Sequence, residues 1–187
     1  MEWFYTFFSK ENLKELLNWL LHLVIAVAIG LFIITFVAQR TVVYNFSMEP
    51  TLHEGDNLLV EKISPRLGII RRGDIVTIKN VLKEYDGEDK TIIKRVIAIG
   101  GDNIEIKNSK VFVNGEELKE DYINGSSTSP QDAKYSLMKV PDGFFYVLGD
   151  NRARPILDSR TIGPVKASDI NGKAIFRFYP FNMIGKL

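Results

Sequence analysis

The hydrophobic pattern changes character at about residue 40. Residues 16–38 form an almost unbroken apolar run, in which Asn18, His22 and Thr35 are the polar exceptions. At about 1.5 Å per residue, a helix of this length reaches roughly the 30 Å of a bilayer hydrocarbon core. A cleaved secretory signal has a shorter apolar core, of about 7–15 residues, and ends in a small-residue site. The pattern therefore predicts an uncleaved transmembrane anchor helix over residues 16–38.

The segment before this run, residues 1–15, mixes aromatic and charged side chains. This mixture is typical of a segment at the membrane surface, where aromatic rings lie at the headgroup level. Lys10 and Lys14 precede the span and Arg40 follows it, so the charge bias leaves the orientation of the helix open. We expect residues 1–15 to form a cytoplasmic or interfacial segment.

After Arg40 the apolar residues follow a period of two or form short runs, which indicates β-strands. Turns rich in Gly and Asn separate the runs. Residues 83–90 are expected to form a charged loop, 122–135 a mobile polar excursion on the surface, and 167–170 a helical turn. The pattern predicts a mainly β domain over residues 39–187, with a barrel or sandwich-like body. Its strands are expected at 41–44, 57–63, 75–78, 91–99, 103–106, 110–113, 144–148 and 174–178.

Composition limits the partners and catalytic groups that this chain can be expected to have. The 187 residues carry a net charge of only +1, which gives no electrostatic reason to expect a nucleic-acid partner. Cysteine is absent, which excludes disulfides, a cysteine nucleophile and thiolate metal sites. Of the two histidines, His22 falls within the apolar run and His53 is interpreted as a solvated loop residue. If a serine is the nucleophile, its base is therefore not expected to be histidine.

Ser47 is the candidate nucleophile. It lies in the segment 45–52, between the first two predicted strands and just before Pro50. Serine, threonine and proline are common turn residues, so this segment alone favours a turn role over a nucleophile. The choice depends on whether the rest of the chain supplies a base.

Lys94 is the candidate base. In the predicted strand 91–99, alternation places Lys94 on the face of Ile92 and Val96, opposite Arg95. Desolvation lowers the pKa of a lysine, and a neutral amine beside a serine hydroxyl can act as a general base. The alternative is that the Lys94 ammonium extends to solvent from the edge of the strand.

Two acidic and basic pairs follow the strand at 144–148. Asp150 and Arg152 are two residues apart, as are Asp158 and Arg160. Such pairs can fix a loop by ion pairing or by hydrogen bonds to the backbone. We interpret these four residues as structural support rather than as catalytic groups.

The motifs taken together resemble those of bacterial type I signal peptidases in order and spacing. The resemblance covers the chain from the anchor to the C-terminus, including Phe176-Arg177-Phe178-Tyr179-Pro180, and the short chain with one span resembles the Gram-positive branch. It is carried by Ser47-Met48-Glu49-Pro50-Thr51-Leu52, Gly55-Asp56, Ile93-Lys94-Arg95-Val96, Gly101-Asp102, Gly149-Asp150-Asn151-Arg152 and Asp158-Ser159-Arg160.

The resemblance implies a membrane-anchored serine endopeptidase with a signal-peptidase-like β-barrel domain behind one transmembrane helix. It implies that the enzyme removes N-terminal signal peptides from exported preproteins by cutting after small residues, typically alanine at −1 and a small residue at −3. Ser47 matches the nucleophile and Lys94 the general base, and neither a metal nor another cofactor is implied. The positions that line the apolar substrate pockets are matched by Val43, Leu52, Leu58 and Ile93.

The resemblance also implies a location and partners. The anchor would cross the cell membrane once, with its N-terminus in the cytoplasm and the catalytic domain outside the cell. The partners would be the lipid bilayer and the preprotein substrates, with pilin subunits or the secretion translocon left open.

Two departures from the family pattern stand out. Asn45 occupies a position that is usually glycine or serine, and its amide could donate to an oxyanion or serve the turn. The segment Ala153–Leu157 is one residue longer than usual and lacks the serine that normally helps orient the lysine. The second departure suggests a specialised substrate range.

Two other hypotheses compete with a general signal peptidase. A self-cleaving Ser-Lys repressor of related fold would need a DNA-binding domain where this chain has an apolar span. A pilus-associated assembly factor of signal-peptidase shape would have narrow or no proteolytic activity. Such a factor could dispense with both Ser47 and Lys94, yet both are present.

Overall fold

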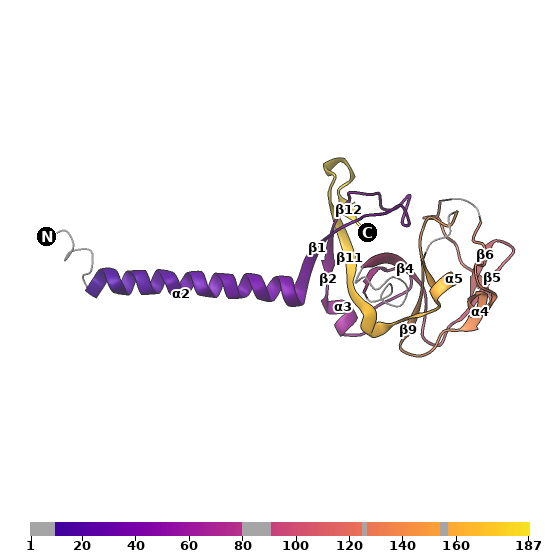
Figure 1. Cartoon of the computed structure of the whole chain (residues 1–187), viewed down its shortest axis with the longest axis horizontal. Helices are drawn as coiled ribbons and strands as arrows, with labels where there is room; N and C mark the ends of the chain where they lie inside the picture. The colour runs from indigo at the N-terminus through magenta and orange to yellow at the C-terminus, as the bar shows by residue number, and fades with distance from the viewer. Residues whose placement is uncertain (1–9, 80–90, 125–126, 154–156) are drawn as a thin grey trace. The chain divides into compact units, whose positions relative to one another are not determined.

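The computed structural model describes residues 10–79, 91–124, 127–153 and 157–187 (Figure 1). It divides into two compact units, one that ends at Val37 and one that extends from Ala38 to Leu187. The predicted loop at 83–90, residues 1–9 of the N-terminal segment and residues 154–156 of the lengthened segment lie outside the described residues.

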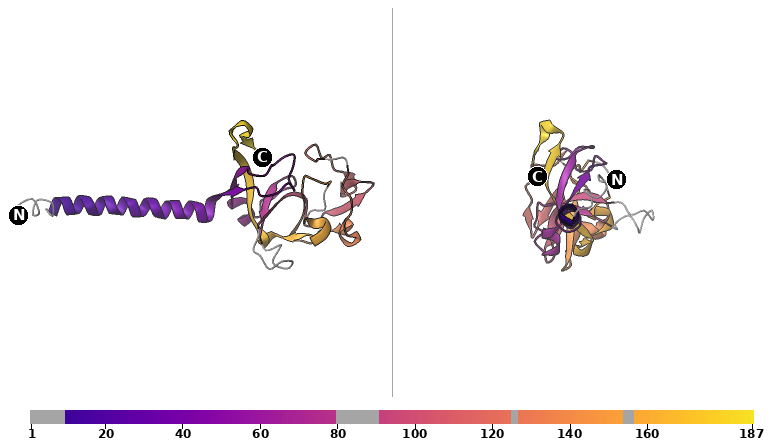
Figure 2. Two further views of the ribbon diagram at one scale, coloured as in Figure 1. Left: turned by 45° about the horizontal axis from the view of Figure 1, so that its top comes forward. Right: turned by 90° about the vertical axis from the view of Figure 1, so that its left-hand side faces the viewer.

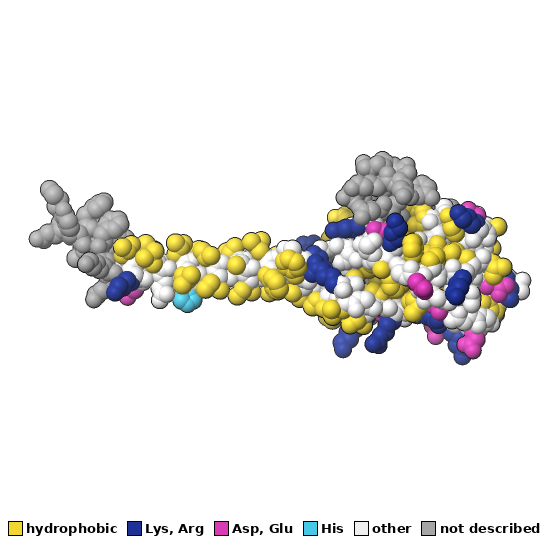
Figure 3. All heavy atoms as spheres, turned by 90° about the horizontal axis from the view of Figure 1, so that it is seen from below, with side chains coloured by type: hydrophobic (Ala, Val, Ile, Leu, Met, Phe, Trp, Pro, Cys, Tyr) yellow, Lys and Arg dark blue, Asp and Glu magenta, His cyan; other side chains and the backbone are white. Residues whose placement is uncertain are grey.

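Helix α2 (Lys10–Phe32) carries the apolar run and continues as a π-helical turn, η1 (Ile33–Val37). The stretch Asn12–Val37 is long and apolar enough to cross a membrane. Its side chains are exposed, and Figure 3 shows hydrophobic groups along the helix on the face in view. The helix begins before the apolar run because lysine, glutamate and leucine, which open it, are good helix formers.

The second unit is mainly β, as predicted from the alternation. Its larger sheet has the order β1-β2-β11-β3-β4-β9-β10, with β12 pairing with β11, and every pairing in it is antiparallel. Figures 1 and 2 show the sheet strongly curled. Its strands are β1 (Ala38–Val42), β2 (Asn57–Glu61), β3 (Ile75–Ile78), β4 (Ile92–Ile99), β9 (Phe144–Leu148), β10 (Val165–Lys166), β11 (Ile170–Tyr179) and β12 (Gly185–Lys186).

A smaller antiparallel sheet has the order β7-β6-β5-β8 and lies at the other side of this unit from β1, β2 and β11 (Figures 1 and 2). It comprises β5 (Asn103–Lys107), β6 (Lys110–Val113), β7 (Glu116–Glu117) and β8 (Leu137–Lys139). The short helical turns of the unit are α3 (Ile63–Arg66), α4 (Ala133–Ser136), α5 (Ser159–Ile162), η2 (Ala167–Asp169) and η3 (Phe181–Met183).

The first strand departs from its prediction. Residues 41–44 are expected as strand, but β1 covers Ala38–Val42 and pairs along its whole length with β2. The chain leaves the ladder at Val43, whose N–H donates to the Asp56 carbonyl and whose carbonyl accepts from the Gly55 N–H. Pairing with a distant strand thus sets the boundary, which the local pattern does not contain.

The polar segment 122–135 was predicted to be a mobile surface excursion, and this prediction is wrong at Thr128. The Thr128 side chain is buried, and its hydroxyl accepts a hydrogen bond from Arg152. Asp132 caps α4 through a hydrogen bond from the Lys134 N–H, and the Tyr135 carbonyl accepts from the Tyr146 hydroxyl. Polar composition fails as a guide here because a buried arginine requires polar partners.

Three buried hydrophobic clusters fill the second unit. One lies between the small sheet and the ends of β4 and β9, and a second lies around β3, β4 and β10. The third cluster lies beside Ser47 and comprises Val43, Met48, Leu52, Leu58, Val60, Ile75, Ile93 and Ala174. We refer to this third group as the site cluster.

Candidate active site

The Ser47 turn follows β1 and is fixed from two directions. Met48 and Leu52 anchor it from within, since both side chains are buried and the Leu52 N–H donates to the Met48 carbonyl. Asn151, which is also buried, holds the backbone of the turn. Its backbone N–H donates to the Ser47 carbonyl (3.1 Å), and its Nδ2 donates to the Phe46 carbonyl (3.1 Å). The backbone at Ser47 is therefore held by hydrogen bonds on both of its sides.

Lys94 reaches this serine from the middle of β4, where it is paired with Val76 of β3. Its side chain is only 1% exposed, and Nζ donates to Ser47 Oγ at 2.8 Å and to the Ile93 carbonyl at 3.1 Å. The alternative interpretation required the Lys94 ammonium to extend to solvent, and it does not.

The environment of Lys94 favours the neutral amine. Burial lowers the pKa of Lys94 to about 8. The negative charges of Asp158 and Asp150 oppose this shift, and the positive charge of Arg160 adds to it. An appreciable fraction of the amine is therefore neutral near neutral pH.

Asn45 contacts the serine with its oxygen. Asn45 Oδ1 accepts from the Ser47 N–H (3.1 Å) and from Ser47 Oγ (2.7 Å). The sequence suggested that the Asn45 amide could donate to an oxyanion. In the structure, Asn45 instead accepts hydrogen bonds from Ser47.

An apolar groove of about 820 Å³ is lined in part by the sequence neighbours of Ser47 and Lys94, Met48 and Ile93. It lies between β1 with the following turn and the start of β4, and its lining includes Val43, Asn45, Met48 and Ile93. Of the residues expected to line the substrate pockets, Val43 and Ile93 line this groove. Leu52 and Leu58 are fully buried in the site cluster, where they pack with Val43 and Ile93.

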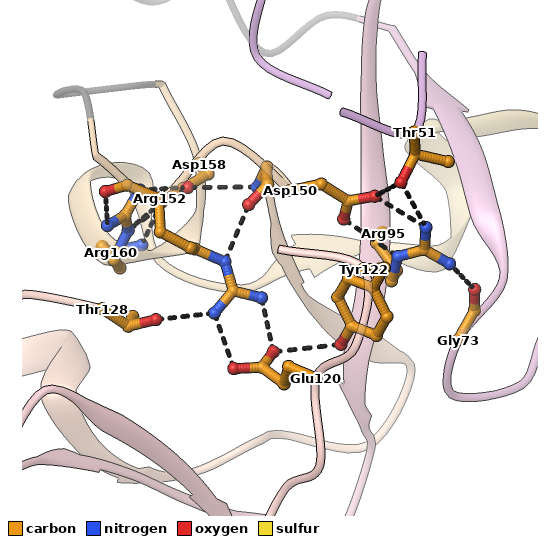
Figure 4. Close-up of polar contacts among 11 residues, drawn as sticks. Thr51, Gly73, Arg95, Glu120, Tyr122, Thr128, Asp150, Arg152, Asp158 and Arg160 are labelled. Carbon is orange, nitrogen blue, oxygen red and sulfur yellow. Dashed lines mark hydrogen bonds and ion pairs between the residues drawn. The ribbon is translucent and has the colours of Figure 1, made fainter. Parts of the chain in front are cut away.

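A network of polar contacts joins four buried residues to their neighbours (Figure 4), namely Asp150, Arg152, Asp158 and Arg160. Asp150 binds Arg95 through two hydrogen bonds, of 2.9 and 2.6 Å, and accepts a third from the Thr51 hydroxyl at 2.6 Å. The Arg95 guanidinium also lies 4.1 Å from the centre of the Tyr122 ring. Asp150 thus connects Arg95, the residue after Lys94, to Thr51 of the turn that contains Ser47.

Arg152 has different partners. Its guanidinium binds Glu120 at 2.5 and 2.9 Å, the Thr128 hydroxyl at 2.7 Å and the Gly149 carbonyl at 2.8 Å (Figure 4). Asp150 and Arg152 therefore bind other residues instead of pairing locally with each other.

Asp158 and Arg160 do pair with each other. Both are buried, and the Arg160 guanidinium donates to Asp158 Oδ2 at 2.8 Å. Asp158 also caps α5, since its carboxylate accepts a hydrogen bond from the Arg160 N–H. A further hydrogen bond to this carboxylate comes from the Gly149 N–H. The charges of both residues act on the pKa of Lys94.

No role is predicted from the sequence for several residues around the site, namely Thr51, Arg95, Glu120, Thr128 and Asn151. Three of them adjoin predicted site residues within the quoted motifs, which is a signal that could have found them. Glu120 and Thr128 carried no such signal, because the partner that explains them, Arg152, is distant in sequence. Among the described residues, no group of three His, Asp or Glu side chains is placed to hold a metal ion.

A serine hydroxyl in contact with a buried amine, beside an apolar groove, is an arrangement suited to serine-based hydrolysis of a polypeptide. It lies in a mainly β unit that follows an apolar helix.

The sequence comparisons with known proteins agree with this class. The family model for "Signal peptidase, peptidase S26" matches residues 16–179. Signal peptidase I S of Bacillus subtilis is 35% identical, over 95% of this chain and 98% of its own length. The signal peptidases I of Leptolyngbya laminosa and Bacillus licheniformis are 39% and 32% identical, over 87% and 95% of this chain and 79% and 96% of their own lengths. A solved signal peptidase I of Enterococcus faecalis is 27% identical and covers 56% of this chain and 95% of its own, with a TM-score of 0.43.

The chain belongs to the signal peptidase family, peptidase S26. Its activity is that of signal peptidase I, a serine endopeptidase that removes signal peptides from exported preproteins.

Proposed function

We propose that the chain is a membrane-anchored signal peptidase I in which Ser47 is the nucleophile and Lys94 the general base. The observation that carries the proposal is the 2.8 Å contact between Lys94 Nζ and Ser47 Oγ, made by two buried side chains. Histidine has no part in the proposal, since His53 is outside this contact and His22 is in α2.

In the proposed reaction, neutral Lys94 accepts the hydroxyl proton while Ser47 Oγ forms a bond to the scissile carbonyl carbon. The tetrahedral intermediate then collapses, the C–N bond breaks, and the Lys94 ammonium returns the proton to the leaving amine. A water molecule, deprotonated by Lys94, next attacks the acyl carbon, and Ser47 Oγ leaves with the proton. Donors aimed at the oxyanion contribute strongly in such reactions, since loss of one costs about 10²–10³ in turnover in a well-studied protease. The backbone N–H of Ser47 is the donor proposed for that role.

The groove supports an extended substrate. Among the described strands β1 pairs with β2 alone, so its other edge is available to a peptide laid along it. Val43 and Ile93 line the groove, and Leu52 and Leu58 pack behind them. An apolar wall filled from behind would accept small side chains and exclude large ones. We therefore propose cleavage after small residues, in Ala-X-Ala-like sequences.

The exported substrates support the proposed orientation. Because preproteins are processed after they emerge from the membrane, we propose that α2 crosses the cell membrane with the N-terminus in the cytoplasm and the second unit outside.

The test uses the full chain in detergent with a preprotein that carries an Ala-X-Ala site. Ser47→Ala and Lys94→Ala are expected to abolish cleavage, whereas Ser168→Ala and Lys166→Ala, at exposed positions, serve as matched controls. Replacing the alanine at −1 by leucine should also abolish cleavage. Equal processing by wild type and both site variants would refute the assignment. Binding of the preprotein without cleavage by wild type would favour the assembly-factor hypothesis.

A further inference from the structure

The contact between Asn45 and Ser47 engages both groups of the serine that the reaction needs. A single oxygen, Asn45 Oδ1, accepts from the Ser47 N–H at 3.1 Å and from the hydroxyl at 2.7 Å. A backbone N–H can only donate, so it fixes which end of the carboxamide faces the serine. The amide oxygen faces it, and the amide nitrogen points away.

This contact competes with catalysis in two ways. The Ser47 N–H is the donor that a substrate carbonyl needs, and it is already bound to Asn45. The hydroxyl proton is also directed at Asn45 Oδ1, while Lys94 Nζ donates to Oγ. Proton transfer to Lys94 requires the opposite arrangement, with Oγ donating to the amine.

Asn45 is placed so that a substrate can displace it. Its side chain is exposed and lines the groove, between the exposed Tyr44 and Phe46. The backbone on either side is held, at Val43 by Asp56 and Gly55 and at Ser47 by Asn151. Rotation of the Asn45 side chain can therefore release Ser47 without moving the nucleophile.

We propose that the Asn45 carboxamide occupies the oxyanion site of the free enzyme and that a peptide entering the groove must turn it aside before Ser47 can react. Asn45 is thus a positioning residue that holds the enzyme in a resting state and adds a threshold to substrate binding. The proposal rests on the function proposed above, since it assumes that Ser47 is the nucleophile.

The expected effect is opposite to that of an oxyanion donor. Removing the carboxamide should lower KM, because the enzyme no longer has to break this contact when substrate binds. A hydrogen bond of ordinary net strength corresponds to an increase in kcat/KM of about 2- to 10-fold. If the amide instead donated to the oxyanion, its loss would lower kcat by about 10²–10³ with KM little changed.

The experiment measures kcat and KM of the full chain in detergent, using an Ala-X-Ala peptide, for wild type, Asn45→Ala and Asn45→Gly. Asn182→Ala, at an exposed position in η3, is the matched control. Thermal unfolding midpoints establish that the variants are folded, and Asn45→Gly removes the same carboxamide should the alanine variant fold poorly. A lower KM in the folded variants, with kcat within about twofold of wild type, is the expected result.

A pH profile separates this role from a purely structural one. Without Asn45 Oδ1 the hydroxyl proton is free to face Lys94 Nζ, which favours the neutral amine, so the acid limb of the kcat/KM profile should move to lower pH. The charges that act on Lys94, Asp158, Asp150 and Arg160, remain in place. A large loss of kcat, or kinetics and pH profile equal to those of Asn182→Ala, would overturn the inference. Absence of cleavage by wild type would instead refute the proposed function.

Discussion

At the residue scale, the burial of Lys94 decides its chemistry. A lysine ammonium is strongly hydrated, and removing it from water disfavours the charged form. Lys94 is 1% exposed, and among the described residues its hydrogen-bond acceptors are the Ser47 hydroxyl and the Ile93 carbonyl. The same strand position with access to solvent would carry an ordinary cation that could not accept the serine proton at neutral pH.

The pKa of Lys94 predicts the pH dependence of the reaction. The pKa is lowered to about 8, so the neutral base predominates above pH 8 and the inactive ammonium below it. We expect kcat/KM to rise about tenfold per pH unit up to about pH 8 and then to level off. Initial rates with an Ala-X-Ala peptide between pH 6 and 10 test this. A profile that is flat down to pH 6 would contradict a lysine base.

The Asp158–Arg160 pair predicts a stability effect. Asp158→Asn keeps an oxygen to cap α5 but leaves the Arg160 charge buried without its partner. Breaking a buried ion pair in this way should lower the free energy of unfolding by about 3–5 kcal/mol. Urea unfolding measures the difference.

The matched control is Glu105→Gln, which removes the solvent-accessible ion pair between Glu105 and Lys107. A surface pair contributes about 0–1 kcal/mol, so this variant should unfold almost as wild type does. Equal losses in the two variants would mean that burial of the Asp158–Arg160 pair does not determine its contribution.

At the scale of elements, β4 and β11 organise the second unit. β4 carries Lys94 and Arg95 on opposite faces, so that one residue contacts Ser47 and the next binds Asp150. β11 pairs with β2 on one side and β3 on the other, with irregular register in both pairings. These irregularities bend the strand and curl the sheet that holds the site.

Gly172 of β11 lies at one of these irregularities, where β11 and β2 pack closely. A Cβ at this position would lie 2.4 Å from Val60 Cγ1 and 2.7 Å from the Glu61 carbonyl oxygen. Because the second neighbour is backbone, β2 itself would have to move, and Gly172→Ala should lower the free energy of unfolding by about 1–3 kcal/mol.

Gly185→Ala, in β12, is the control, since nothing lies within 4 Å of the added Cβ. Chemical unfolding of both variants compares the two sites. Wild-type stability in Gly172→Ala would show that the contact between β11 and β2 relaxes at little cost.

At the scale of the whole molecule, the two units differ in where their apolar side chains lie. All residues of the three hydrophobic clusters fall between Val43 and Ala174, within the unit that begins at Ala38. The apolar side chains of α2 are exposed along the helix and need lipid or detergent to cover them. The second unit therefore has the core required to fold alone.

Removal of α2 should separate catalysis from membrane attachment. A chain of residues 38–187 is expected to fold and to cleave an Ala-X-Ala peptide, but not to sediment with lipid vesicles as the full chain does. Peptide assays and vesicle sedimentation, performed on both chains, measure the two properties. Loss of folding in the shortened chain would show that the second unit depends on α2.

Features that repeat along the chain or depend on local chemistry could be predicted from the amino-acid sequence alone. The apolar run predicted a helix able to span a membrane, and alternation predicted most strands of the mainly β unit, because both patterns are periodic and local. The ordered motifs, with no cysteine and few histidines, pointed to Ser47 and Lys94 before any contact between them was known.

Which side chains meet depends on the three-dimensional fold. The burial of Lys94 depends on its neighbours in the sheet, and Arg152 binds Glu120 and Thr128 rather than the nearby Asp150. The start of β1 depends on pairing with β2. The orientation of Asn45 was also beyond the sequence, because a carboxamide can donate or accept, and here the Ser47 N–H imposes the oxygen.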